Sequence, residues 1–192
     1  MSSNFNKIFP YLAEQIINDY EIEKGICLDI GTGPGSLGLE IAKISDLKVY
    51  LVDIDPEAIE KCRKNIKKLE LDSQVIPVEM DVKNMDFPDN FADIIVSRGS
   101  IWFWDDRPRG LKEIYRVLKK GGIGFVGGGL RRNLPEKYRK YLAEERKNRK
   151  NDEEWIRIRS EDYFKEILVE AGIDSYRLIF DPPVGRWVEI HK

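Results

Sequence analysis

The sequence predicts an α/β protein: a doubly wound, mostly parallel seven-stranded sheet that ends in an antiparallel hairpin. Short apolar segments alternate with amphipathic ones from residue 25 to residue 130, the order of strands and helices in a parallel sheet covered on both faces. Residues 176–180 and 186–190 instead alternate apolar with polar side chains around a Pro-Pro-Val-Gly turn, which is typical of a hairpin. The hydrophobic content of 42% indicates a globular protein.

An amphipathic helix precedes the first strand. Pro10 is tolerated only near the start of a helix, so we expect a short turn followed by a helix from Pro10. This helix either packs on the sheet or covers a bound ligand, in which case Tyr11 lies near that ligand. The apolar residues at helical spacing are Phe5, Ile8, Phe9, Leu12, Ile16, Ile17 and Tyr20.

We expect strand and helix to alternate through five strands. The last helix of this series should end at Lys119-Lys120-Gly121-Gly122, because cations followed by glycine favour a helix C-terminus. The expected strands are 25–30, 48–53, 75–80, 92–97 and 123–127, and the expected helices are 36–44, a helix from Pro56 with Ile59, Cys62, Ile66 and Leu69 buried, and a helix around Leu111, Ile114 and Leu118.

The region after the fifth strand is less regular. Residues 131–150 contain nine Lys and Arg but only three Glu, so they form either a solvated amphipathic helix that packs as a lid or a surface that grips phosphates. Ser160 is expected to cap the next helix, which Gly172 closes. The apolar face of the charged segment would be formed by Leu134, Tyr138, Tyr141 and Leu142.

A glycine-rich turn joins the first strand to the first helix. Glycine permits positive φ and lets the backbone approach a ligand, and the helix starting near Ser36 offers its N-terminal N–H groups. Residues 33–38 fit the dinucleotide pattern G-x-G-x-x-G, whereas residues 29–35 fit D-x-G-x-G-x-G. The turn alone predicts a nucleotide-type ligand and leaves both interpretations open.

Polar side chains end four of the expected strands. Asp29, Asp53 and Asp81 lie at or just after the ends of the first three, and Ser97 ends the fourth. Any one acid at a strand end could simply be solvated. Ligands of doubly wound sheets bind outside the carboxyl ends of the strands, however, so four such residues at one edge favour a binding site.

Together these features resemble the class I S-adenosylmethionine-dependent methyltransferases over residues 25–130 and in the closing hairpin. In that family an acid stands two residues before the first glycine, as Asp29 does, and acids follow the second and third strands, as Asp53 and Asp81 do. The sequence Leu118-Lys119-Lys120-Gly121-Gly122 matches the Leu-Lys-x-Gly-Gly turn before the family's fifth strand. The resemblance implies a three-layer αβα fold, S-adenosylmethionine as cofactor and methyltransferase activity.

The resemblance also implies a role for each residue at this edge. Asp53 would accept both ribose hydroxyls, and Ile54 would pack on the adenine face. Asp81 would bind the exocyclic amine of adenine, and Val82 would offer its backbone N–H to the ring. The glycine loop would lie against the methionine portion, with Asp29 orienting both the loop and the ligand's ammonium group. The remaining expected contacts are Gly31, Thr32, Gly33 and Gly35 in the loop and Ser97 and Arg98 after the fourth strand.

We expect residues 1–192 to form a single methyltransferase domain. Its parts would be an N-terminal helical cap at 1–24, a cofactor-binding core at 25–130, a charged helical insertion or lid at 131–159, and a closing helix and hairpin at 160–192. The family often varies acceptor specificity in the inserted region, so this segment is a candidate substrate cover.

The acceptor region is expected just after the fourth strand. Trp102 and Trp104, with Phe103 between them, either wall an apolar or aromatic acceptor or belong to the core. With Tyr11, these two tryptophans are the candidate substrate residues.

The sequence offers no obvious catalytic base. His191, the only histidine, is expected to be a tail residue after the last strand. Asp105 and Asp106 either act as bases or cap a helix. We therefore expect positioning and water exclusion to contribute most of the catalysis.

A small-molecule acceptor is the favoured hypothesis, because a net charge of −2 provides no global field that recruits nucleic acid. The alternatives are an RNA methyltransferase that uses residues 131–150, an NAD-binding oxidoreductase and a non-catalytic cofactor-binding module. No metal site is expected, since Cys27 and Cys62 are typical of buried free thiols. The absence of a long apolar run and of a signal peptide favours a cytoplasmic protein without membrane contact.

Overall fold

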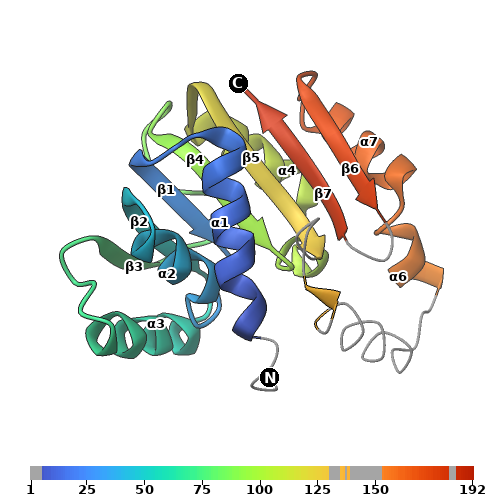
Figure 1. The fold of residues 1–192 in the computed structure, drawn as a ribbon. Helices are drawn as coiled ribbons and strands as arrows, with labels where there is room; N and C mark the ends of the chain where they lie inside the picture. Colours follow the sequence, from blue (N-terminus) through green and yellow to red (C-terminus); the bar gives the residue numbers. More distant parts are fainter. Residues whose placement is uncertain (1–5, 130–134, 137, 139–152, 182–184) are drawn as a thin grey trace.

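The computed structural model describes residues 6–129, 135–136, 138, 153–181 and 185–192. Within these residues seven strands form one sheet in the order β3-β2-β1-β4-β5-β7-β6 (Figure 1). β1 to β5 pair in parallel, and β7 runs antiparallel to both β5 and β6. The expected sheet with its closing hairpin is therefore confirmed. The strands are β1 (Lys24–Ile30), β2 (Asp46–Asp53), β3 (Val75–Glu79), β4 (Ala92–Arg98), β5 (Leu118–Gly129), β6 (Tyr176–Asp181) and β7 (Gly185–His191).

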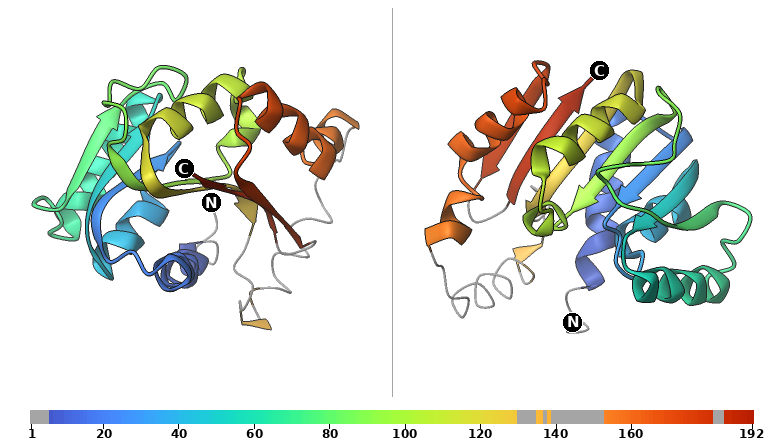
Figure 2. Two further views of the ribbon diagram at one scale, coloured as in Figure 1. Left: turned by 90° about the horizontal axis from the view of Figure 1, so that it is seen from above. Right: turned by 180° about the vertical axis from the view of Figure 1, so that it is seen from behind.

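Helices cover both faces of the sheet. Figure 2 shows α1 and α2 on one side and α4 and α7 on the other, and Cys62 and Ile66 of α3 belong to the same core as the buried apolar side chains of α1. This is the three-layer arrangement that the resemblance implies. The helices are α1 (Phe9–Tyr20), α2 (Ser36–Lys43), α3 (Pro56–Lys68), α4 (Arg107–Val117), α6 (Glu153–Arg157) and α7 (Glu161–Glu170), with 3-10 turns η1 (Asn6–Ile8) and η2 (Ile101–Phe103).

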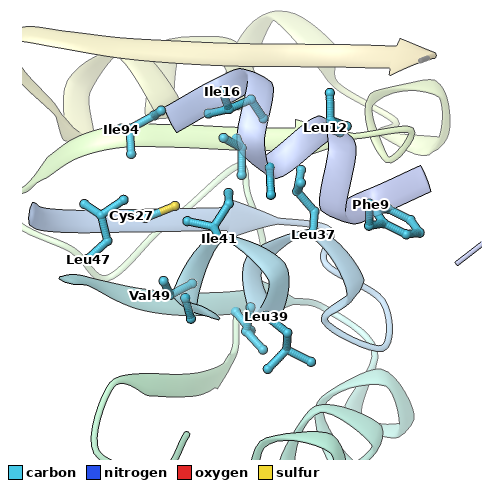
Figure 3. Packing of buried hydrophobic residues seen from close by; sticks show 14 of the residues in the cluster. Phe9, Leu12, Ile16, Cys27, Leu37, Leu39, Ile41, Leu47, Val49 and Ile94 are labelled. Carbon is cyan, nitrogen blue, oxygen red and sulfur yellow. The ribbon is translucent and has the colours of Figure 1, made fainter. Parts of the chain in front are cut away.

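The central strands are buried on both faces, as parallel strands between helical layers must be. Cys27 of β1 faces the core formed with α1 and α2, whereas its neighbour Leu28 faces the core formed with α4 and α7. Figure 3 shows the first core from close by, with side chains of α1 and α2 meeting those of β1, β2 and β4. The labelled residues of that core are Phe9, Leu12, Ile16, Cys27, Leu37, Leu39, Ile41, Leu47, Val49 and Ile94.

The connection between β3 and β4 departs from the expected alternation, because residues 80–91 form a loop without a helix. The rings of Phe87 and Phe91 stack with centroids 5.0 Å apart, and each meets Tyr50 of β2 edge-on at 5.5 Å. Arg116 of α4 donates a 2.9 Å hydrogen bond to the Phe87 carbonyl. Aromatic rings thus cover this part of the sheet, and the Phe87 backbone is bonded to α4.

The start of β5 also differs from the expectation. α4 ends at Val117, and residues 118–122 belong to β5 instead of ending the helix. The pairing register with β4 shifts between Ala92 and Ile94, which lets these residues bulge. Gly121, at φ +81°, donates its N–H to the carbonyl oxygen of Lys192 at 2.6 Å. The turn at Gly121 thus belongs to β5 and is bonded to Lys192.

The expected helix ends are largely confirmed. α1 begins at Phe9 with Pro10 in its first turn and follows the short η1 turn. Ser160 caps α7, its Oγ accepting the backbone N–H of Tyr163 at 3.2 Å. Of the apolar face expected in the charged segment, only Tyr138 lies within the described residues, so the lid and the four-part division of the chain stay predictions.

Candidate functional site

The strand order reverses between β1 and β4, and doubly wound sheets bind ligands at such a switch point. Gly33 follows β1 and Gly99 follows β4, with φ of +56° and +84°. A Cβ built on either glycine would meet no atom within 4 Å. The backbone at the switch point therefore faces open space beside the strand ends that carry the acids.

The glycine loop is fixed on its protein side. Gly31, at φ +63°, packs so closely on Ser100 that a Cβ there would overlap the serine side chain. The Thr32 backbone N–H donates to the Val52 carbonyl at 3.1 Å, and the Gly35 N–H donates to the Thr32 carbonyl at the same distance. These contacts hold a tight turn that leaves open space in front of Gly33.

Asp29 is buried beneath this loop, with 2% of its surface exposed. Its Oδ2 accepts the Thr32 hydroxyl at 2.6 Å and the Gly38 N–H of α2 at 2.9 Å. Burial raises the pKa of Asp29 to about 6, although both hydrogen bonds oppose that shift. The structure places this carboxylate where it ties β1, the loop and α2 together; its contact with a ligand's ammonium group stays a prediction.

Asp53 ends β2 beside the loop. Its Oδ2 accepts the Gly33 N–H at 2.7 Å, and its Oδ1 accepts the Asp55 N–H at 3.1 Å. Each carboxylate oxygen has further acceptor capacity, so the group suits two neighbouring hydroxyls. Ile54, the next residue, is 65% exposed. An exposed isoleucine beside such an acid fits the predicted packing against a flat apolar ring.

The loop after β3 carries Asp81 and Val82, as predicted, together with a partner that sequence reasoning missed. Lys83 Nζ lies 2.8 Å from Asp105 Oδ2 and 3.5 Å from Asp81 Oδ2. The hydrogen bond to Asp105 raises the pKa of Lys83, and the same bond lowers the pKa of Asp105. Arg109 of α4 also donates to the Lys83 carbonyl at 3.0 Å. α4 therefore fixes the loop that we predict to bind adenine. No local sequence pattern indicates this contact.

Ser97 and Arg98 at the end of β4 serve other contacts in this structure. Ser97 is fully buried, and its hydroxyl lies 2.6 Å from that of Ser100. Arg98 donates to the Gly129 carbonyl at 3.2 Å, and its guanidinium lies 4.9 Å from the ring centre of Phe9. Their predicted contacts with the cofactor stay untested, while their visible contacts join β4, β5 and α1.

The candidate acceptor residues separate into core and surface. Trp102 is 7% exposed and packs edge-on against Phe164 of α7, with ring centroids 5.6 Å apart. Trp104 is partly buried against Gly110, and Phe103 is 79% exposed. The structure thus places Trp102 in the core, Trp104 at its margin and Phe103 at the surface.

Tyr11, the third candidate substrate residue, lies on α1. Its ring packs against that of Tyr138 with centroids 5.9 Å apart. Tyr11 also packs against the core beneath α1. The expectation that this residue reaches the substrate stays a prediction.

The three groups considered as bases all have partners. Asp105 pairs with Lys83, and Asp106 caps α4 by accepting the Arg109 N–H at 3.0 Å. His191 is not a tail residue: it ends β7, pairs with Ile123 of β5 and lies 2.9 Å from Glu189. The expectation for His191 was wrong because the hairpin extends one residue further than its alternation suggested.

The described residues contain no group of three or more His, Cys, Asp or Glu that could hold a metal ion. Cys27 and Cys62 are free and buried, as expected. No described helix is long and apolar enough to cross a membrane.

Comparison with known proteins identifies the family. A family model described as a methyltransferase domain matches residues 28–126. The rice (Oryza sativa subsp. japonica) enzyme 2-methyl-6-phytyl-1,4-hydroquinone methyltransferase 1 is 38% identical over 102 residues, which are 53% of this chain and 30% of that protein. The mitochondrial arginine-hydroxylase NDUFAF5 of Rattus norvegicus is 33% identical over 126 residues, 62% of this chain and 35% of its own length. The chain thus spans about a third of each of these relatives.

A solved structure matches over nearly the whole chain. A Methanococcus maripaludis protein, provisionally described as an S-adenosyl-L-methionine-dependent methyltransferase, superposes with a TM-score of 0.86 and is 38% identical. The match covers 99% of this chain and 87% of that one. The fold, the acids at the strand ends and these matches agree: the chain belongs to the class I S-adenosylmethionine-dependent methyltransferases, enzymes that use S-adenosylmethionine as methyl donor.

Proposed function

We propose that this chain transfers the methyl group of S-adenosylmethionine to a small-molecule acceptor. The observation that carries the proposal is the joint geometry of the glycine loop and Asp53 at the switch point. The Gly33 N–H binds the Asp53 carboxylate at 2.7 Å, and the space in front of Gly33 is open. A loop and an acid held together in this way provide adjacent sites for an amino-acid portion and a ribose.

The residues at this edge fit the cofactor. Asp53 would hold the ribose hydroxyls, and the exposed Ile54 would cover one face of the adenine. Asp81 and Val82, on a loop fixed by Arg109, would meet the adenine edge. The loop around Gly33 would take the methionine portion, where a larger residue would strain the backbone at φ +56°.

The bound cofactor supplies an electrophilic methyl group on a positively charged sulfur. The chain's own contribution is then to align an acceptor with that methyl group and to exclude water, and alignment alone is worth up to about 7–11 kcal/mol. Asp105, Asp106 and His191 are engaged with Lys83, Arg109 and Glu189 respectively. We therefore propose that transfer proceeds without a base from these three residues.

The small-molecule acceptor is supported by the rice relative, whose name gives a substituted hydroquinone as its substrate. The exposed ring of Phe103 and the partly buried ring of Trp104 lie just past β4, where they suit an apolar or aromatic molecule. Phe103 and Trp104 are therefore the residues that we propose as the acceptor wall, whereas Trp102 supports them from the core.

The test combines binding with a search for the acceptor. Isothermal calorimetry should show binding of S-adenosylhomocysteine and no binding of NADH. The enzyme is then incubated with methyl-labelled S-adenosylmethionine and a cell extract, which is separated into small-molecule, RNA and protein fractions. Label in the small-molecule fraction supports the proposal, and label confined to RNA or protein contradicts it. Mass spectrometry of the product distinguishes a methyl gain from the oxygen gain expected of a hydroxylase.

A further inference from the structure

The glycine loop is held from beneath by a helix that carries none of the predicted ligand contacts. α3 follows β2 and runs back under the loop, and two of its side chains reach loop carbonyls. Asn65 donates its Nδ2 hydrogen to the Pro34 carbonyl at 2.8 Å, and the Cys62 thiol donates to the Gly33 carbonyl at 3.1 Å. The two residues lie three positions apart, so both project from the same face of α3.

With these two contacts, each of four successive loop carbonyls has a hydrogen-bond donor. The Thr32 carbonyl accepts the Gly35 N–H, and the Gly35 carbonyl accepts the Leu39 N–H of α2. The two carbonyls between them are those that Cys62 and Asn65 hold. All four carbonyl oxygens therefore already accept a hydrogen bond from the protein. A carbonyl oxygen turned outward would repel an anionic group in front of the loop, such as an α-carboxylate.

α3 is also joined to the acid that ends β2. The Asp55 side chain caps α3 by accepting the Glu57 N–H at 2.9 Å, while its own N–H donates to Asp53. Asp53 in turn accepts the N–H of Gly33, whose carbonyl accepts the Cys62 thiol. Both peptide groups of Gly33 are thus fixed, one by the strand-end acid and one by α3.

We propose that Asn65 and Cys62 are positioning residues of the cofactor site: they hold the loop carbonyls inward so that the loop accepts the amino-acid portion of the ligand. This inference rests on the proposed function, because it assumes that the loop binds S-adenosylmethionine. Neither residue touches the ligand. Their effect is therefore specific to the part of the ligand that lies against the loop.

The test uses Asn65→Leu, which keeps the approximate shape of the side chain and removes its donor without adding charge. S-adenosylhomocysteine should bind about tenfold more weakly, the loss expected when one hydrogen bond no longer fixes the loop. 5′-Methylthioadenosine, which lacks the amino-acid portion, should lose less than about threefold. A general loosening of the fold would weaken the binding of both ligands equally. A larger loss of affinity for S-adenosylhomocysteine than for 5′-methylthioadenosine is therefore the readout.

Gln74→Met is the matched control. The half-buried Gln74 also donates its side-chain amide to backbone carbonyls, those of Ser45 and Leu47, at 2.7 and 2.9 Å. Ser45 immediately precedes β2 and Leu47 lies near its start, at the opposite end of the strand from Asp53 and the glycine loop. The control should lower thermal stability to a similar degree and leave both dissociation constants unchanged.

A second pair of variants keeps the proposal testable if Asn65→Leu does not fold. Cys62→Ala removes the donor to the Gly33 carbonyl and should weaken S-adenosylhomocysteine selectively, whereas Cys62→Ser retains a donor and should restore binding. Equal losses for both ligands, or unchanged binding in both donor-removing variants, overturn the inference. If the unmodified protein fails to bind S-adenosylhomocysteine, the proposed function itself has failed.

Discussion

The backbone amide of Gly33 lies 2.7 Å from Oδ2 of Asp53, so the turn after β1 is bonded directly to the acid that ends β2. The two residues are 20 positions apart in the chain, and the parallel pairing of β1 with β2 brings them together. This bond makes the loop and the acid one unit, and each affects how the other binds a ligand.

Replacing Asp53 tests that unit. Asp53→Asn leaves one oxygen that accepts and one amide that donates, so it cannot accept from two ribose hydroxyls and the Gly33 N–H together. We expect the dissociation constant for S-adenosylhomocysteine to rise about 10- to 100-fold, the loss of a charge-assisted hydrogen bond. Calorimetry of the purified variant measures it. Asp46→Asn, at the other end of the same strand, is the control and should bind normally; normal binding by both variants would count against the site.

The buried carboxyl of Asp29 should make stability depend on pH. Its pKa is raised from 3.8 to about 6 in the folded protein, so its stabilising contribution is complete below pH 3.8 and is lost as the pH rises through about 6. A shift of this size corresponds to about 3 kcal/mol. Urea unfolding from pH 4 to pH 7.5 should show the unmodified protein losing stability relative to Asp29→Asn across that range. A stability difference between the two proteins that does not change with pH would refute the raised pKa of Asp29.

The aromatic residues after β4 should behave differently from one another. Trp102→Ala should cost about 3–5 kcal/mol of unfolding free energy, because this side chain is buried against Phe164. Phe103→Ala should change stability by less than about 0.5 kcal/mol, since its ring is 79% exposed. Urea denaturation measures both. If Phe103 helps to wall the acceptor, its variant should lose kcat/KM while keeping full stability, and unchanged kinetics would remove it from the acceptor wall.

Glu189 forms a buried polar cluster on the sheet face next to α1, with its side chain only 4% exposed. It accepts hydrogen bonds from Tyr20 at 2.6 Å and Arg177 at 2.8 Å, and lies 2.9 Å from His191. Burial alone would raise the pKa of Glu189, but the bonds from Arg177 and Tyr20 outweigh it and lower the pKa. Glu189→Gln should therefore cost about 1.5–3 kcal/mol at pH 7.

The pH dependence at Glu189 should have the opposite sign to that at Asp29. Because its folded pKa is lowered, its contribution is present above the unfolded value of 4.5 and is lost as the pH falls through the folded pKa. The free energies of unfolding of Glu189→Gln and of the unmodified protein, measured with urea, should thus approach each other as the pH falls. Binding of S-adenosylhomocysteine should not change, because His191 of this cluster pairs with Ile123 at the opposite edge from the glycine loop. A widening stability gap in acid would contradict the charge assignment.

Much of the candidate site could be placed from the sequence because its residues are fixed by local patterns. The strand-end positions of Asp29, Asp53 and Asp81 follow from where apolar segments stop, and parallel pairing brings strand ends to one edge. The helix caps at Ser160 and Asp106 follow from side-chain oxygens that precede helical segments. Such features depend on neighbours within a few residues.

The sequence by itself determined the sheet, the hairpin and the glycine loop with its acids, since periodicity and turn chemistry are local. Only the tertiary structure decided that residues 80–91 cover the sheet with aromatic rings and that Trp102 belongs to the core. It alone brought Cys62 and Asn65 under the loop carbonyls. The physical reason is that such contacts are chosen by packing between elements distant in the chain, and a local pattern shows which face is buried but not which atom it meets.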